Sequence, residues 1–76
     1  MVLGLETEKP IHDRLSGREY SVMLKIASGK TVGDISKEMA LSVKTISTYR
    51  ARILAKMQMK NNAELTYYVI SNRLTG

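Results

Sequence analysis

The chain has 76 residues, with twelve Lys and Arg against seven Asp and Glu, and it contains no cysteine. A chain of this length buries only about 60% of its unfolded surface, so it needs a well-packed helical core or covalent staples. The lack of cysteine excludes disulfides and thiolate zinc sites, which leaves helices packed on helices as the expected architecture. The formal charge of +5 indicates an anionic partner, either nucleic acid or a membrane surface.

The N-terminal segment differs in composition from the rest of the chain. Residues 1–14 hold the only proline and three acids against two bases, without a sustained hydrophobic period. We expect this segment to be interdomain linker or vector-derived sequence, and residues 15–76 to form the folded, positively charged part. No apolar stretch approaches the roughly 20 residues that span a bilayer, and no secretory signal is visible, so a cytosolic protein without membrane contact is expected.

Two capping patterns predict the first two helices. Ser16, with Glu19 three residues on, is a capping box that predicts a helix to about Ser28. The same pattern at Thr31 predicts a short helix that ends near Ala40. No segment alternates strictly enough to indicate a strand, so we expect an all-α fold.

The third helix is predicted to be the longest. It begins after Ser42 and meets no Gly or Pro before about Met59. A helical wheel places its buried stripe at Val43, Ile46, Ile53 and Met57, with Tyr49 and Leu54 at the borders. A fourth helix is predicted after Asn61 or Asn62, with Leu65, Tyr68 and Val69 on its inner side.

The opposite face of the third helix is basic, hydroxylated and built from small side chains. Its residues are Lys44, Thr45, Ser47, Thr48, Ala51, Arg52, Ala55 and Lys56. Small residues let a helix approach base edges, while Lys and Arg at the rim reach phosphates. The joint with the second helix is only about two residues long, which predicts a helix-turn-helix whose second helix lies in the major groove. Because the core needs the apolar face, double-stranded DNA is preferred over a membrane as partner.

Several segments together resemble the LuxR/NarL/FixJ-type C-terminal DNA-binding domain. They are LSGRE (15–19), IASGK (26–30), IS (35–36), LSVKTI (41–46) and ILAKM (53–57), and KTISTY (44–49) looks closest to the BvgA/EvgA-like branch of two-component response regulators. The resemblance implies a four-helix LuxR-type helix-turn-helix domain over residues 15–76 that binds promoter DNA as a homodimer. It also implies a receiver domain in the full-length protein and RNA polymerase as a partner.

The resemblance also implies roles for individual positions. Base-reading sites fall on Ser47, Thr48 and Ala51, and phosphate-contacting sites fall on Thr45 and Lys56, while Lys44 and Arg52 are added from the helical wheel. Ser47 and Ala51 are weaker readers than the Lys often found there, which shifts weight to Thr48, Arg52 and DNA shape. Ala40 stands where many members carry Gly, so a left-handed backbone there costs about 1–2 kcal/mol.

Arg50 departs from the pattern of the basic face. It lies about 40° from the centre of the buried stripe. We therefore expect it to pair with an acid such as Glu19 or Glu64, with a phosphate contact as the alternative.

The fourth helix carries more apolar surface than one buried stripe requires. The resemblance implies that Tyr67, Tyr68 and Ile70 form a dimer interface. The alternative is that its two sides pack against the first helix and the linker, and the rival function is a protein-interaction module that uses this surface without DNA. The sequence lacks the residues that an enzyme active site requires. His12 is the only histidine, and no metal-ligating partner is expected for it, so no catalytic residue, metal or cofactor is predicted.

Overall fold

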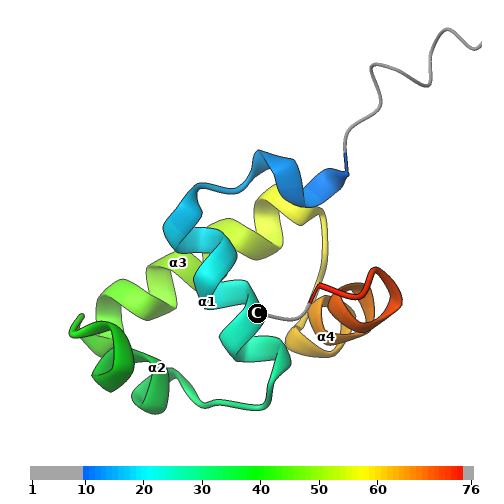
Figure 1. Cartoon of the computed structure of the whole chain (residues 1–76). Helices are drawn as coiled ribbons and strands as arrows, with labels where there is room; N and C mark the ends of the chain where they lie inside the picture. Colours follow the sequence, from blue (N-terminus) through cyan, green and yellow to red (C-terminus); the bar gives the residue numbers. More distant parts are fainter. Residues whose placement is uncertain (1–9, 75–76) are drawn as a thin grey trace, which may run out of the picture.

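The structure is a computed structural model that describes residues 10–74. It contains a short 3-10 turn, η2 (Ile11–Arg14), followed by α1 (Gly17–Ala27), α2 (Val32–Met39), α3 (Val43–Met57) and α4 (Asn62–Ser71). No strand occurs in residues 10–74. The predicted all-α, four-helix fold is therefore confirmed, and Figure 1 shows α3 behind α1 with α2 and α4 at either end of that pair.

The four α-helices begin at the capping residues that the sequence predicted. Ser16 Oγ accepts a hydrogen bond from the Glu19 N–H at 3.2 Å, and the Glu19 carboxylate accepts one from the Ser16 N–H at 2.8 Å. Thr31 forms the same reciprocal box for α2. Ser42 and Asn61 accept from the third residue of α3 and α4. Local sequence therefore determines where each helix starts.

Three of the helices are followed by a non-glycine residue with a left-handed backbone. Ala40 has φ 56° after α2, Gln58 has φ 58° after α3, and Arg73 has φ 56° beyond the end of α4. The Leu41 N–H then bonds the Ser36 carbonyl at 3.0 Å, which closes the end of α2. The cost predicted for a left-handed Ala40, about 1–2 kcal/mol, therefore applies.

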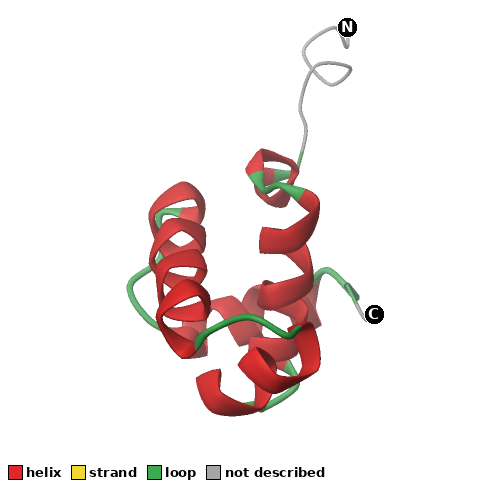
Figure 2. Cartoon of the chain, turned by 90° about the vertical axis from the view of Figure 1, so that its left-hand side faces the viewer, coloured by secondary structure: helices red, strands yellow, loops and turns green. Residues whose placement is uncertain are grey.

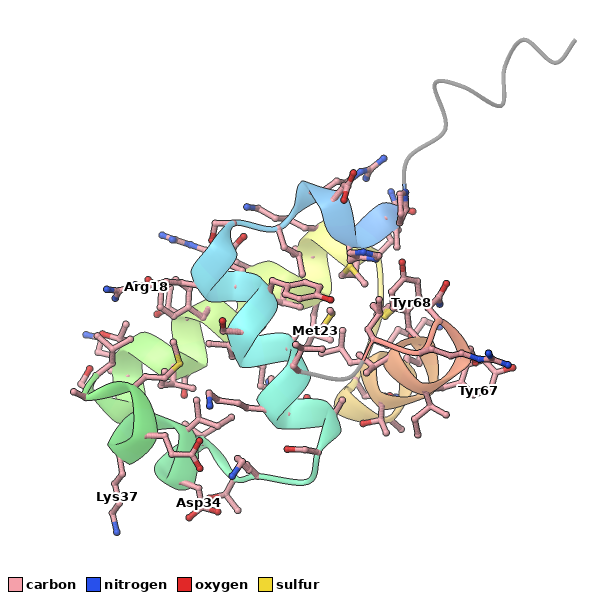
Figure 3. The ribbon with its side chains drawn as sticks, viewed as in Figure 1. Arg18, Met23, Asp34, Lys37, Tyr67 and Tyr68 are labelled. Carbon is pink, nitrogen blue, oxygen red and sulfur yellow. The ribbon has the colours of Figure 1, made fainter. Side chains whose placement is uncertain are left out.

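The core lies where α1 meets the other three helices. Its buried residues are Val22, Met23, Ile26, Ile35, Ile46, Ile53, Met57, Leu65 and Val69. Figure 3 shows Met23 on the side of α1 that faces α4. Val43, predicted in the buried stripe of α3, is 52% exposed, so that prediction was wrong. Side chains lean toward the N-terminus of their helix, and at the first position this directs Val43 past the helix end into solvent.

The joint between α2 and α3 spans residues 40–42. It is too short for the two helices to run back side by side, and they meet at an angle (Figure 1). In Figure 2, α1 descends below η2 and α3 stands opposite it, with α2 across their lower ends. The outer side of α3 therefore faces away from α1 and away from the core.

Part of the segment expected to be linker packs on the fold. Ile11 of this segment contacts the core, as does Leu15 of the expected domain. His12, for which no metal-ligating partner was expected, has its Nδ1 2.8 Å from the Tyr68 hydroxyl and its ring 5.6 Å from that of Tyr20. Residues 1–9 lie outside the described part, and the domain boundary at residue 15 stays a prediction.

Candidate nucleic-acid interface

Hydrogen bonds order the hydroxyl groups at the start of α3. Ser42 Oγ accepts from the Thr45 N–H at 3.0 Å and forms a hydroxyl–hydroxyl hydrogen bond with Thr45 Oγ1 at 2.9 Å. One turn later, Thr48 Oγ1 donates to the Lys44 carbonyl at 3.0 Å. Each of the two threonine hydroxyls is therefore tied to a particular neighbour.

Most of the residues selected from the sequence lie on the outer side of α3, but Lys56 is directed toward α1, where it pairs with Glu19. Lys44, Ser47, Thr48, Ala51, Arg52 and Lys56 are exposed, and Thr45 is half-buried. A shallow hollow of about 270 Å³ is lined by Lys44, Thr45, Thr48, Tyr49 and Arg52. The structure thus gathers four of the seven predicted residues at one hollow, while Ser47, Ala51 and Lys56 lie outside it.

The charge of this hollow is not neutralised within the fold. Helix α3 contains no Asp or Glu. Within residues 10–74, Lys44 and Arg52 take part in no ion pair, whereas Lys25 and Lys30 both pair with Glu38. The hollow therefore offers two free cations beside two hydroxyl groups, a combination that suits a phosphate backbone and base edges.

Lys56 has a partner that the sequence did not indicate. Its Nζ lies 2.8 Å from Oε1 of Glu19, whose residue surface is only 3% exposed. The hydrogen bonds from Lys56 and from the Ser16 N–H hold the pKa of the Glu19 carboxyl below its usual value of 4.5, against the opposing effect of burial. The sequence indicated Glu19 as a capping residue and as a candidate partner of Arg50, but nothing local to it points to a lysine 37 positions further on.

Arg50 has a different partner from either acid proposed for it. Its Nε donates to Oδ1 of Asn62 at 2.7 Å, and it forms no ion pair in residues 10–74. Glu19 is taken by Lys56, and Glu64 accepts from the Lys60 backbone N–H at 2.8 Å. The predicted pairing of Arg50 with an acid was therefore wrong, and the residue instead joins α3 to the first residue of α4.

Helix α4 leaves a part of its apolar surface uncovered. Tyr67 is 75% exposed and Ile70 67% exposed, and Figure 3 shows Tyr67 on the outer side of α4. Tyr68 is half-buried, with its hydroxyl on His12. A groove of about 500 Å³ runs beside these tyrosines, lined also by Met59 and Ala63. Packing against α1 and the N-terminal turn thus covers Tyr68 but not Tyr67 or Ile70.

Within residues 10–74, the helices are too short or too polar to cross a membrane.

The short angled joint between α2 and α3, together with a basic outer side on α3, defines the helix-turn-helix class. A family model described as "Bacterial regulatory proteins, luxR family" matches residues 13–69. The chain therefore belongs to the luxR family of bacterial regulatory proteins, as its resemblance predicted. This makes it a DNA-binding domain of transcription regulation and not a member of an enzyme family.

Two relatives show where such a domain occurs. "Response regulator UvrY" of Escherichia coli (strain K12) is 39% identical over 69 residues, which cover 91% of this chain and 31% of that protein. "DNA-binding transcriptional activator EvgA" of the same strain is 39% identical over 71 residues, covering 93% and 35% respectively. The chain thus spans about a third of the length of these relatives.

Proposed function

We propose that the outer side of α3 binds in the major groove of double-stranded promoter DNA, in a sequence-specific manner. The observation that carries this proposal is the hollow on α3, where Lys44 and Arg52 are free of ion pairs beside Thr45 and Thr48. Helix α2 would cross the backbone, as the first helix of the motif does in this docking mode.

The seven residues divide into two roles in this complex. Thr45, Lys56, Lys44 and Arg52 contact phosphates or the groove rim, and Ser47, Thr48 and Ala51 face the bases. Lys56 keeps two ammonium hydrogens beyond the one that Glu19 takes, and its side chain is 41% exposed, so a phosphate contact is compatible with the ion pair.

The exposed part of α4 serves as the contact between two copies of the chain on DNA. Tyr67 and Ile70 supply uncovered apolar surface, and Tyr68 borders the adjoining groove. A two-fold interface of this kind would set the spacing of two half-sites on DNA. The rival use of the same surface, as a protein-interaction module without DNA, is favoured only by that exposure.

The full-length protein is the response regulator of a two-component system, with a receiver domain beyond this segment and RNA polymerase as a partner. The printed descriptions of the two relatives support this, because one is a response regulator and the other a transcriptional activator. The chain's coverage of about a third of each relative leaves room for a second domain.

Salt dependence tests the proposal. Binding of a random-sequence duplex, followed by fluorescence anisotropy, should weaken as salt rises with a log-log slope near −0.9 per phosphate contact. Selection from random oligonucleotides should then enrich a defined half-site. Absence of duplex binding at low salt would leave the protein-interaction module as the better account.

A further inference from the structure

We infer that Thr48 reads its base as a hydrogen-bond acceptor, and so favours a base whose major-groove edge carries an exocyclic amino group, adenine or cytosine. This inference rests on the proposed docking of α3 in the major groove. It states whether Thr48 donates or accepts the hydrogen bond to the base, which the position of Thr48 alone does not determine.

The hydrogen of the Thr48 hydroxyl is already committed. Its Oγ1 lies 3.0 Å from the Lys44 carbonyl oxygen, and a carbonyl only accepts. The hydroxyl must therefore be the donor in this bond. Because Thr48 is exposed and borders the hollow on α3, what it presents outward is an oxygen lone pair and a methyl group.

Thr45 differs from Thr48 because its partner is another hydroxyl. Thr45 Oγ1 lies 2.9 Å from Ser42 Oγ, and each of these two hydroxyls can donate to the other. When Ser42 donates, the Thr45 hydrogen is available to a phosphate oxygen, which only accepts. Of the two threonines at the hollow, only Thr48 is therefore fixed as a donor within the fold, which leaves its oxygen to accept.

The base edges differ in how they meet an acceptor. In the major groove adenine presents its N6 amino group and cytosine its N4 amino group, whereas guanine presents only acceptors, and thymine an acceptor and a methyl group. To donate to guanine or to the thymine O4, Thr48 must first break its bond to the Lys44 carbonyl. One hydrogen bond of ordinary strength corresponds to a preference of roughly three- to tenfold.

Two variants of Thr48 and one control separate the contribution of its hydroxyl oxygen from that of its methyl group. Thr48→Val keeps shape and methyl but loses the oxygen, and Thr48→Ser keeps the oxygen but loses the methyl. Thr66→Val is the matched control, because Thr66 Oγ1 makes the same bond to the carbonyl four residues back, Asn62, but on α4. Each variant and the wild type undergo selection from random oligonucleotides, and affinities are then measured by fluorescence anisotropy on the selected duplex.

The wild type, Thr48→Ser and Thr66→Val should prefer the same base, adenine or cytosine, at one position of the selected site. Thr48→Val should show no base preference at that position. Removing that amino group, by purine for adenine or 2-pyrimidinone for cytosine, should weaken the first three roughly three- to tenfold and leave Thr48→Val unchanged. Two outcomes overturn the inference while the docking of α3 stands. One is that Thr48→Val keeps the base preference, and the other is that the wild type prefers guanine or thymine at this position and Thr48→Val loses that preference. No duplex binding by the wild type overturns both.

Discussion

Lys56 Nζ lies 2.8 Å from Oε1 of Glu19, across the contact between α3 and the first turn of α1. The same carboxylate closes the capping box with Ser16, and its residue surface is only 3% exposed. A buried charge thus links the start of α1 to the C-terminal part of the proposed DNA-binding helix. Lys56 consequently has a structural role whether or not it also touches a phosphate.

Lys56→Ala should destabilise the fold by about 2 kcal/mol, because it leaves the buried carboxylate of Glu19 without its cation. This destabilisation is smaller than that expected for a fully buried ion pair, because the Lys56 side chain is 41% exposed and water can partly replace its ammonium group. Urea denaturation gives the free energy of unfolding. Lys25→Ala, which removes one of the two partners of the exposed Glu38, is the control and should cost less than 1 kcal/mol.

A double-mutant cycle identifies Glu19 as the cause. In the Glu19→Gln background, where the capping hydrogen bond can persist, Lys56→Ala should cost much less than in the wild type. An equal cost in both backgrounds would mean that Lys56 contributes through its aliphatic stem instead.

The stability of the domain should fall as the solution is acidified. Hydrogen bonding to Lys56 and to the Ser16 N–H lowers the folded-state pKa of Glu19 below its usual value of 4.5. The ionised carboxylate therefore stabilises the fold above the unfolded pKa, and this contribution is lost as the pH falls through the folded pKa. Denaturation between pH 7 and pH 3 measures the slope.

Glu19→Gln should flatten this pH dependence. Some slope will remain, because hydrogen bonds from Lys25 and Lys30 also lower the pKa of the exposed Glu38. Glu38→Gln is the matched control, and its effect on the slope should be smaller than that of Glu19→Gln. A larger effect from Glu38→Gln would contradict the role given to the buried pair.

Ala40→Gly should raise the free energy of unfolding by up to about 1 kcal/mol. Glycine relieves the strain of φ 56°, and the greater freedom of the unfolded chain offsets part of that gain. Ala55→Gly, at an exposed position inside α3, should instead lower stability by about 1 kcal/mol. Thermal unfolding of the two variants distinguishes them, since opposite signs are expected for the same chemical change.

The uncovered surface of α4 should matter for cooperative binding but not for a single half-site. The double variant Tyr67→Ser, Ile70→Ser removes exposed apolar area and leaves the buried Leu65 and Val69 in place. Its affinity for a duplex with two selected half-sites should drop toward that for one half-site, as followed by anisotropy. Equal affinities of variant and wild type on both duplexes would reject the dimer contact.

Local signals in the sequence were sufficient to predict the helices. Ser16, Thr31, Ser42 and Asn61 each cap a helix because the bonds involved span three residues, a distance that sequence spacing reveals. The buried stripe of α3 was also predictable from its period, apart from Val43, where the end of the helix interrupts the periodic pattern. The helical period alone does not show which turns of a helix are left uncovered by the other helices.

Partners across the fold were not predictable in the same way. The Glu19–Lys56 pair joins positions 37 apart, and the His12–Tyr68 contact joins positions 56 apart. Both depend on how helices pack, so charge and spacing alone favoured the wrong partner for Arg50. For the candidate site, the helical wheel predicted which residues of α3 share a face, but the donor role of Thr48 toward the Lys44 carbonyl follows from a hydrogen bond that only coordinates reveal.

The most direct test of the account compares the removal of one charge on α3 with the removal of one charge elsewhere. Arg52 borders the hollow without an ion pair, whereas Arg73, also without one in residues 10–74, lies beyond the end of α4. Fluorescence anisotropy of a labelled duplex measures the affinity of Arg52→Ala and Arg73→Ala. If α3 binds the duplex, Arg52→Ala alone should show a clearly weaker affinity and a salt slope reduced by about 0.9. Equal affinities and slopes for the two variants would contradict the assignment of α3 as the DNA-binding helix.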